Sequence, residues 1–192
     1  MFLGGVEMNI KEASKWGVDF GNVLIQNLDQ EARKQVSALF SCGRMCHPID
    51  RVDELDVILV AHSCMVSGAL EGLKTLIERR GAEHVWIVSC AKELERFVNR
   101  RLIAVHKIRE VTGLREDHIF FVDKREGKAG ICRNLGIEAH IDDRGEVLSH
   151  LVNIVPNLIW FSPTERDVRE WSTVLPTTTL RVNGWDELIP QL

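Results

Sequence analysis

The sequence predicts an α/β fold, a Rossmann-like three-layer α/β/α sandwich with a parallel sheet of about five strands. Two observations predict it. Short, nearly continuous apolar runs, typical of strands buried on both faces, alternate with segments whose apolar residues recur at helical spacing. The chain also has 192 residues, 45% hydrophobic and 27% charged, as expected for one soluble globular domain. We therefore expect a single domain over residues 1–192.

The expected strands follow from these apolar runs. The first is VDFGNVLI at 18–25, and we expect the sheet edge to lie around Asp19. Later strands are expected at 85–89 (VWIVS), 118–123 (HIFFVD), 137–143 (IEAHIDD) and 157–161 (NLIWF). A short strand, TTLRV at 178–182, and a terminal turn of helix complete the chain.

Helices are expected between these strands. One begins at Ser67-Gly68, places five apolar residues on one face and ends at Gly81, a residue typical of helix ends. A long helical stretch runs from about 91 to 112, and Arg100-Arg101 marks a candidate break. Its expected inward residues are Leu94, Phe97, Val98, Val105, Ile108 and Val111. Shorter helices are expected at 128–135, before Gly136, and around 147–151, with a final one after 161.

Composition excludes several classes of protein. The formal charge of −4 and the pI near 6.0 argue against a mainly nucleic-acid-binding protein or a polybasic membrane surface. The first 16 residues lack the pattern of a signal peptide, and no apolar run approaches the length of a membrane span. The expected location is therefore the cytoplasm.

The five cysteines do not predict a disulfide framework, because their number is odd and their spacing irregular. Cys42, Cys46 and His47, in CGRMCH, invite a metal or haem interpretation. Three residues separate these cysteines, whereas the haem-attachment motif has two. A zinc site would need further ligands, such as His62 and Cys64. We favour structural thiols.

Polar residues stand where the expected strands end. Asp19 closes the first strand, Ser89 the second, and Asp142-Asp143 the fourth, while Lys128 begins the helix before that fourth strand. Ligands of parallel α/β sheets bind beyond the carboxyl ends of the strands. Carboxylates brought together there repel each other unless a cation separates them, so a divalent ion is implied.

These residues carry a resemblance to the haloacid-dehalogenase-like (HAD) superfamily, whose members are mostly phosphatases. Motif one, D-x-D-G-[TV] after a strand, is similar to Asp19-Phe20-Gly21-Asn22-Val23. Motif two matches Ser89 after VWIVS, motif three Lys128 in EGKAGICRNLG, and motif four HIDDRGEVL. All four occur in order between about residues 15 and 162. Lys124 and Arg125 are rivals of Lys128, but the family's placement favours Lys128.

The resemblance implies a magnesium-dependent phosphatase that acts on a phosphate monoester through an aspartyl-phosphate. It implies these roles: Asp19 as nucleophile; Ser89, Lys128 and Asn22 as phosphate contacts; and Asp19, the Gly21 carbonyl, Asp142 and Asp143 as Mg²⁺ ligands. Ser89 and Lys128 thus join Asp19 in the catalytic set. A small phosphorylated substrate is the expected partner, with neither nucleic acid nor membrane.

Gly21 departs from the family's motif. It replaces the second aspartate, which normally protonates the leaving group, and Asn22 cannot do so. Such acid–base help typically contributes about a hundred- to ten-thousand-fold. Three interpretations follow: a phosphatase whose protons come from water or another residue, an impaired protein that binds a phosphorylated ligand or partner, and a dehalogenase. Asp142-Asp143 counts against the last, since that branch generally lacks the metal.

Room for a substrate-covering cap exists only at about 26–66, and it suffices for a small one. A helix is expected within DQEARKQVSALF, with Asp29 as its cap and Val36, Leu39 and Phe40 inward. DVILVAH is a second apolar element. Arg44, His47 and His62 are candidate substrate contacts in this insert, although we favour ordinary surface positions for them.

Overall fold

The computed structural model describes residues 10–41 and 51–192, and its centre is a six-stranded parallel sheet with the order β3-β2-β1-β4-β5-β6. The strands are β1 (Trp16–Val18), β2 (Val85–Cys90), β3 (Ile119–Val122), β4 (Ala139–Asp142), β5 (Asn157–Phe161) and β6 (Leu180–Val182). The predicted parallel α/β fold is confirmed. The sheet exceeds five strands because β6 pairs with β5 in parallel.

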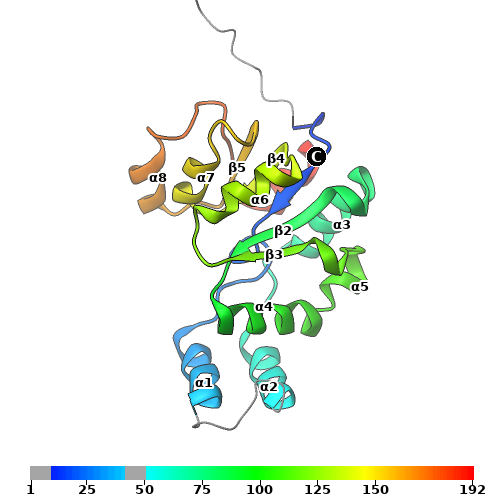
Figure 1. Ribbon diagram of the computed structural model, residues 1–192, viewed down its shortest axis with the longest axis vertical. Coiled ribbons are helices and arrows are strands. Elements are labelled where there is room, and N and C mark those ends of the chain that lie inside the picture. Colours follow the sequence, from blue (N-terminus) through cyan, green and yellow to red (C-terminus); the bar gives the residue numbers. More distant parts are fainter. Residues whose placement is uncertain (1–9, 42–50) are drawn as a thin grey trace, which may run out of the picture.

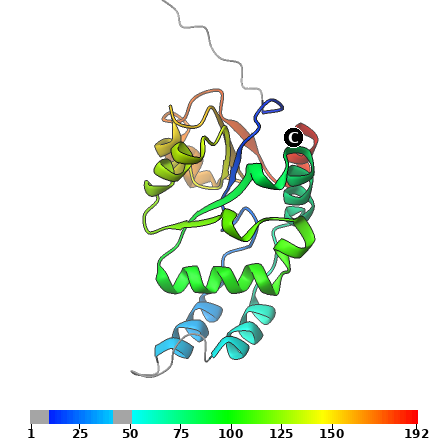
Figure 2. The same cartoon turned by 45° about the vertical axis from the view of Figure 1, so that its right-hand side comes forward.

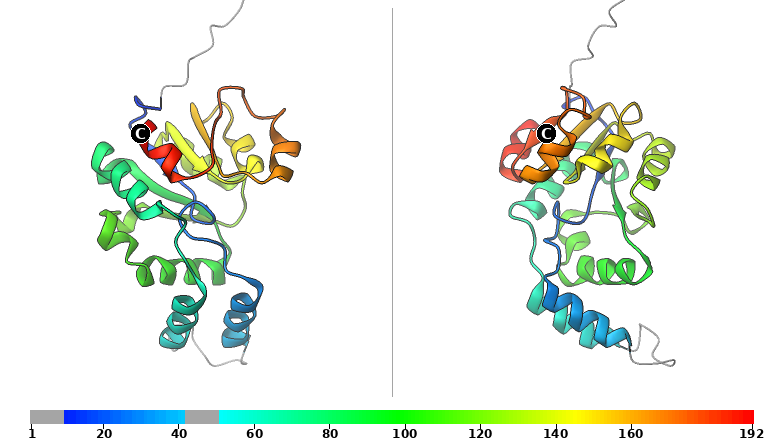
Figure 3. Two further views of the ribbon diagram at one scale, coloured as in Figure 1. Left: turned by 180° about the vertical axis from the view of Figure 1, so that it is seen from behind. Right: turned by 90° about the vertical axis from the view of Figure 1, so that its left-hand side faces the viewer.

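Helices cover both faces of this sheet (Figures 1 and 3). They are α1 (Gln30–Ser41), α2 (Val52–His62), α3 (Ala69–Arg80), α4 (Glu93–Val105), α5 (Ile108–Thr112), α6 (Gly127–Leu135), α7 (Gly145–Leu151), α8 (Glu165–Trp171) and α9 (Trp185–Leu188), with 3-10 turns η2 (Ala82–His84), η3 (Glu116–His118) and η4 (Ile189–Gln191). One face carries α6, α7 and α8, and the other carries α3, α5 and α9. No helix in the described ranges is long and apolar enough to cross a membrane.

Alternating side chains of the central strands fill two cores. In β2, Trp86 and Val88 belong to the core under α6 and α7, whereas Val85 and Ile87 belong to the core under α3. The strand β5 repeats this alternation. Because both faces are buried, these strands are apolar along their whole length. Their positions could therefore be predicted from the apolar runs of the sequence.

The first strand is shorter than predicted, because β1 ends at Val18 and residues 20–25 form a turn. The backbone N–H groups of Leu24 and Ile25 both donate to the Phe20 carbonyl at 3.1 Å, and Asn22 N donates to Ile25 O at 2.7 Å. Its apolar side chains are buried: Phe20, Val23, Leu24 and Ile25. The prediction of a strand over 18–25 is wrong because a buried turn has the same apolar pattern.

The helix expected over 91–112 is divided into α4 and α5, and the break lies at 106–107 rather than at Arg100-Arg101. Lys107 has a φ of 52°, and a left-handed residue ends an α-helix. Two residues expected to point inward are exposed, Leu94 at 38% and Val111 at 44%. The side chain of Leu94 lines the cavity described below.

The segment between the turn and α3 forms a helix pair, α1 and α2, which lies beyond α4 as seen from the sheet (Figures 1 and 2). The predicted cap is confirmed: Asp29 Oδ1 accepts a hydrogen bond from Ala32 N at 2.7 Å. The chain enters and leaves this insert side by side, since Val66 N donates to Leu24 O at 2.9 Å and Gln26 N to Cys64 O at 3.0 Å. Its function as a cap stays a prediction.

Candidate active site

Asp19 stands at the carboxyl end of the central strand β1. Its backbone N–H donates to the Ile141 carbonyl of β4 at 2.9 Å, which continues the β1–β4 ladder one residue beyond the strand. The chain then reverses in the 20–25 turn, where Asn22 adopts a φ of 55°. Asp19 is 7% exposed as a residue, and its buried carboxylate therefore needs partners to remain charged.

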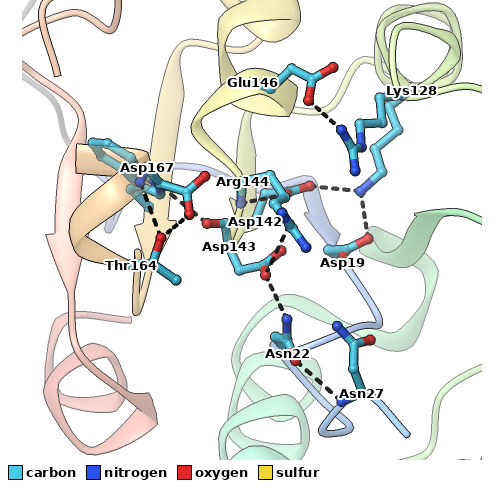
Figure 4. Close-up of polar contacts among 12 residues, drawn as sticks. Asp19, Asn22, Asn27, Lys128, Asp142, Asp143, Arg144, Glu146, Thr164 and Asp167 are labelled. Atoms are coloured by element: carbon cyan, nitrogen blue, oxygen red, sulfur yellow. Dashed lines mark hydrogen bonds and ion pairs between the residues drawn. The ribbon is translucent and has the colours of Figure 1, made fainter. Parts of the chain in front are cut away.

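Lys128, in the first turn of α6, is the principal partner of Asp19. Its Nζ lies 2.5 Å from Asp19 Oδ1 and 2.7 Å from Asp142 Oδ2, and the residue is 2% exposed (Figure 4). Burial alone would lower the pKa of Lys128, but the charges of Asp142 and Asp19 outweigh it and raise that pKa above its ordinary value. The ammonium is thus held charged between two carboxylates.

Asp142, the last residue of β4, is fully buried and accepts hydrogen bonds on both oxygens. Oδ1 accepts from the Arg144 backbone N–H at 3.0 Å, and Oδ2 lies 3.3 Å from His140 Nε2 as well as close to Lys128. Burial would raise the pKa of Asp142. The Lys128 charge and the His140 hydrogen bond outweigh burial and lower that pKa to about 2. Asp142 is therefore a carboxylate at neutral pH.

Asp143 points toward the 20–25 turn. Its Oδ2 accepts from Asn22 Nδ2 at 2.9 Å and lies 3.5 Å from Arg144 Nε, while Asn22 Oδ1 accepts from the Asn27 backbone N–H at 3.2 Å (Figure 4). Burial and the charges of Asp142 and Asp19 raise the pKa of Asp143 to about 7. Crowded carboxylates of this kind favour a bound cation.

Burial likewise raises the pKa of Asp19, with the Asp142 charge acting in the same direction. The Lys128 charge and a hydrogen bond from Ser89 oppose this shift. Ser89 itself is 4% exposed at the end of β2, so the predicted hydroxyl does lie beside Asp19. The site thus combines three acids and one hydroxyl at neighbouring strand ends with one ammonium from the first turn of α6.

The donor set fits a hard divalent cation. Asp19, Asp142 and Asp143 each offer a carboxylate oxygen, and these oxygens lie within 4.8 Å of one another. Among the described residues this is the one such group of His, Cys, Asp or Glu side chains. Oxygen ligands of this charge and number suit Mg²⁺. Gly21, predicted to contribute its carbonyl, lines the same cavity.

A cavity of about 410 Å³ opens from the three acids toward α1 and α4. Asp19, Asn22, Ser89 and Lys128 line its inner end. Residues of α1, α4 and the 20–28 segment line the remainder, among them Leu28, Arg33, Val36, Leu94, Val98, Asn99 and Leu102. Its volume is that of a small-molecule site.

The predicted site residues therefore converge, although their catalytic roles stay predictions. Lys128, and not its rivals, is the buried cation: Lys124 and Arg125 are exposed, and Arg125 pairs with Glu146. The structure describes only some of the residues of the alternative cysteine and histidine site. Cys42, Arg44, Cys46 and His47 lie outside the described residues, and neither His62 nor Cys64 belongs to the acidic cluster or lines the cavity.

His140 and Asn27 escaped the sequence analysis. His140 contacts Asp142 from two positions earlier on β4, and residues two apart on a strand share a face, so this alternation was a usable signal. Asn27 contacts Asn22 only because the 20–25 turn folds back, which no local pattern predicted. His140 thus supports Asp142 through its ring, and Asn27 supports Asn22 through its backbone N–H.

No protein-family model matches the sequence, and no curated protein matches it. Solved structures do match over almost the whole chain. An HAD family hydrolase of Deinococcus radiodurans R1, with bound phosphate and sodium, aligns with a TM-score of 0.58 at 17% identity, covering 94% of this chain and 97% of that one.

Two further structures are similar. The D,D-heptose 1,7-bisphosphate phosphatase of B. bronchiseptica, complexed with magnesium and phosphate, aligns with a TM-score of 0.56 at 15% identity over 92% of this chain and 97% of that one. A haloacid dehalogenase-like hydrolase of Burkholderia xenovorans LB400 gives 0.55 at 12% identity over 92% and 94%. The chain therefore has the HAD-like fold, as the sequence motifs predicted.

Proposed function

We propose that this protein is a magnesium-dependent phosphatase, which cleaves a small phosphate monoester through an aspartyl-phosphate on Asp19. One observation carries the proposal: a buried carboxylate at the end of the central strand is bonded to a buried lysine and lies beside two further acids. Structurally similar proteins hold phosphate with magnesium or sodium, which agrees with this function.

In the first step, a carboxylate oxygen of Asp19 attacks phosphorus and the bond from phosphorus to the leaving oxygen breaks. The leaving group takes a proton from water. Lys128 and Ser89 face the phosphoryl oxygens, where their positive charge and hydroxyl hydrogen stabilise the negative charge that develops. In the second step, water attacks the phosphorus of the aspartyl-phosphate, which releases inorganic phosphate and regenerates Asp19.

Asp19, Asp142, Asp143 and the Gly21 carbonyl would hold Mg²⁺. When bound, the ion supplies positive charge beside the phosphoryl oxygens and relieves the repulsion among the acids. Asn22 and Arg144 hold Asp143 in place, while His140 and the Arg144 backbone hold Asp142. The protein thus positions its acids before any ligand enters, as preorganised catalysis requires.

Gly21 gives the proposed reaction a specific weakness. A side-chain acid at this position would stand close to Asp19 Oδ2, since a Cβ built on Gly21 lies 4.0 Å from that atom. Without the acid, the leaving group must depart with little proton assistance. We therefore expect aryl and acyl phosphates to be cleaved well and simple alkyl phosphates poorly.

The same glycine favours a second candidate function, binding of a phosphorylated ligand or protein partner without turnover. Lys128, Ser89 and the acid cluster would serve binding equally well. A dehalogenase is the third interpretation, and the clustering of Asp142 and Asp143 with Asp19 opposes it, because that cluster suits a cation.

The deciding experiment is hydrolysis of p-nitrophenyl phosphate with Mg²⁺, with chelator, and by the Asp19→Asn variant. Its good leaving group lessens the need for the missing acid. We expect activity that both the chelator and Asp19→Asn abolish, while Asp117→Asn, at an exposed aspartate in η3, leaves it unchanged. Activity that survives in Asp19→Asn would contradict the proposed nucleophile. Mg²⁺-dependent binding of beryllium fluoride without any hydrolysis would instead show a competent nucleophile and metal site and would favour the binding function.

A further inference from the structure

The part of the cavity beyond the acids has an apolar wall. Leu94, Val98 and Leu102 recur every four residues along α4 and line the cavity together, and Val36 lines it from α1. Leu94 is 38% exposed, which is unusual for a leucine at the inward spacing of an amphipathic helix. An apolar stripe that lines a cavity suits the carbon skeleton of a ligand.

The positive charges of the cavity lining differ in their partners. Lys128 lies between Asp19 and Asp142, Arg125 pairs with Glu146, and Arg144 pairs with Asp143. Arg33 is different: among residues 10–41 and 51–192, no acidic side chain lies within ion-pair distance of its guanidinium.

Arg33 is nevertheless held in a defined place. Its Nε donates to the Leu28 carbonyl at 2.8 Å, which anchors the guanidinium by one nitrogen on the 20–28 segment that lines the cavity. The lining acid Glu95 is engaged elsewhere, since its Oε2 accepts from Lys92 N at 2.9 Å at the start of α4. The remaining guanidinium N–H groups of Arg33 can therefore serve a ligand, because an arginine fork suits a carboxylate or phosphate.

Helix stability does not explain this arginine. Arg33 lies in the first turn of α1, where the helix dipole favours acidic residues and disfavours cations. Within the described ranges, Arg33 forms no ion pair with α2, so no such pair holds α1 against α2. Arg33 is exposed, so water can solvate its charge; the observations that favour ligand binding are its anchored Nε and its place in the cavity lining.

We propose that Arg33 binds a second anionic group on the substrate, at the end opposite the phosphate. The substrate class is then a phosphate monoester whose leaving group has an apolar body, seated on the α4 stripe, and carries a carboxylate or a second phosphate. This inference rests on the proposed function, since it assigns the substrate of the same site. It makes Arg33 a specificity-determining residue.

The test measures binding separately from turnover. Two isosteric probes, 4-carboxybenzylphosphonate and 4-carbamoylbenzylphosphonate, differ in the charge of the distal group and cannot be hydrolysed. Calorimetric titration with Mg²⁺ should give about tenfold tighter binding of the carboxylate probe, as one charge-assisted contact provides. A bisphosphonate of the same skeleton shows whether a second phosphate group binds better than a carboxylate.

Three variants test whether the preference for the carboxylate probe comes from Arg33. Arg33→Gln should abolish it and leave binding of the carbamoyl probe within about threefold, whereas Arg33→Lys, which keeps the charge, should retain part of it. Lys34→Gln, at the exposed neighbouring position outside the cavity lining, should retain all of it. Thermal unfolding of each variant checks that α1 remains folded.

The outcomes separate this inference from the proposed function. Equal binding of both probes, or a preference that survives Arg33→Gln, overturns the role of Arg33 even if p-nitrophenyl phosphate is hydrolysed. A charge preference that depends on Arg33 in a protein without hydrolysis supports the subsite and refutes the phosphatase. Failure of every phosphonate to bind, in a protein that hydrolyses p-nitrophenyl phosphate, overturns the Arg33 subsite and leaves the phosphatase standing.

Discussion

Gly17 and His140 are register partners on β1 and β4, and a Cβ built on Gly17 would lie 2.3 Å from His140 Nδ1. The imidazole occupies the space that a side chain on β1 would fill. It is 0% exposed, and its other nitrogen lies 3.3 Å from Asp142 Oδ2. The absence of a side chain at residue 17 therefore lets a buried histidine reach an acid of the site.

Gly17→Ala should destabilise the protein by about 1–3 kcal/mol, because the new methyl group overpacks a site that the ring already fills. The free energy of unfolding, measured in urea, gives the effect. Gly130→Ala in α6 is the matched control: its Cβ would meet nothing within 4 Å, and alanine should stabilise the helix by up to about 1 kcal/mol. Equal effects of both substitutions would contradict the proposed crowding.

Lys128→Met should lower the free energy of unfolding by about 3–5 kcal/mol in the presence of chelator, because it leaves Asp19 and Asp142 buried without their common cation. Adding Asp19→Asn to Lys128→Met should restore part of that loss by removing one carboxylate. A double-mutant cycle from urea unfolding measures this coupling. Strictly additive effects would show that the ammonium does not link the two carboxylates energetically.

Gly21→Asp should restore acid–base assistance in the proposed reaction. The new Cβ would lie 3.0 Å from Asn27 Oδ1, and the exposed Asn27 side chain can move away. Turnover of simple alkyl phosphates should rise by about a hundredfold or more, while p-nitrophenyl phosphate gains much less. Steady-state kinetics on both substrates checks this. Gly21→Asn, of the same size but without an acid, should give no gain, and an equal gain there would exclude proton transfer as the cause.

His106 connects the insert to the core and makes stability depend on pH. Its Nε2 lies 2.7 Å from Ser63 Oγ, just after α2, and burial lowers its pKa below 6.5. Because the folded state disfavours the protonated ring, the unfolded state binds more protons, and stability falls as pH drops from about 7 through 6.5. His106→Gln should reduce this slope in urea unfolding at several pH values. His150→Gln, at an exposed histidine, is the control and should leave it unchanged.

Much of the acid cluster was predictable from the sequence, since the carboxyl ends of parallel strands meet and Asp19 and Asp142 stand at those ends, while Lys128 begins the helix that precedes β4. The 20–25 turn was not, because its buried apolar residues have the pattern of a strand. The break at Lys107 depends on a left-handed backbone at a residue type that rarely adopts it. Arg33 could not be placed either, because its position depends on how the insert packs beside α4.

The side-by-side entry and exit of the insert place the two ends of the helix pair next to each other. Since Leu24 O and Val66 N are 2.9 Å apart, a short turn could join these two residues and close the sheet domain without α1 and α2. The strands that carry Asp19, Ser89 and Asp142 would keep their connections, whereas the α1 wall of the cavity, with Arg33, would be lost. Arg33 and the acid cluster thus lie on separate stretches of chain, so the helix pair could be exchanged while the acids are inherited intact.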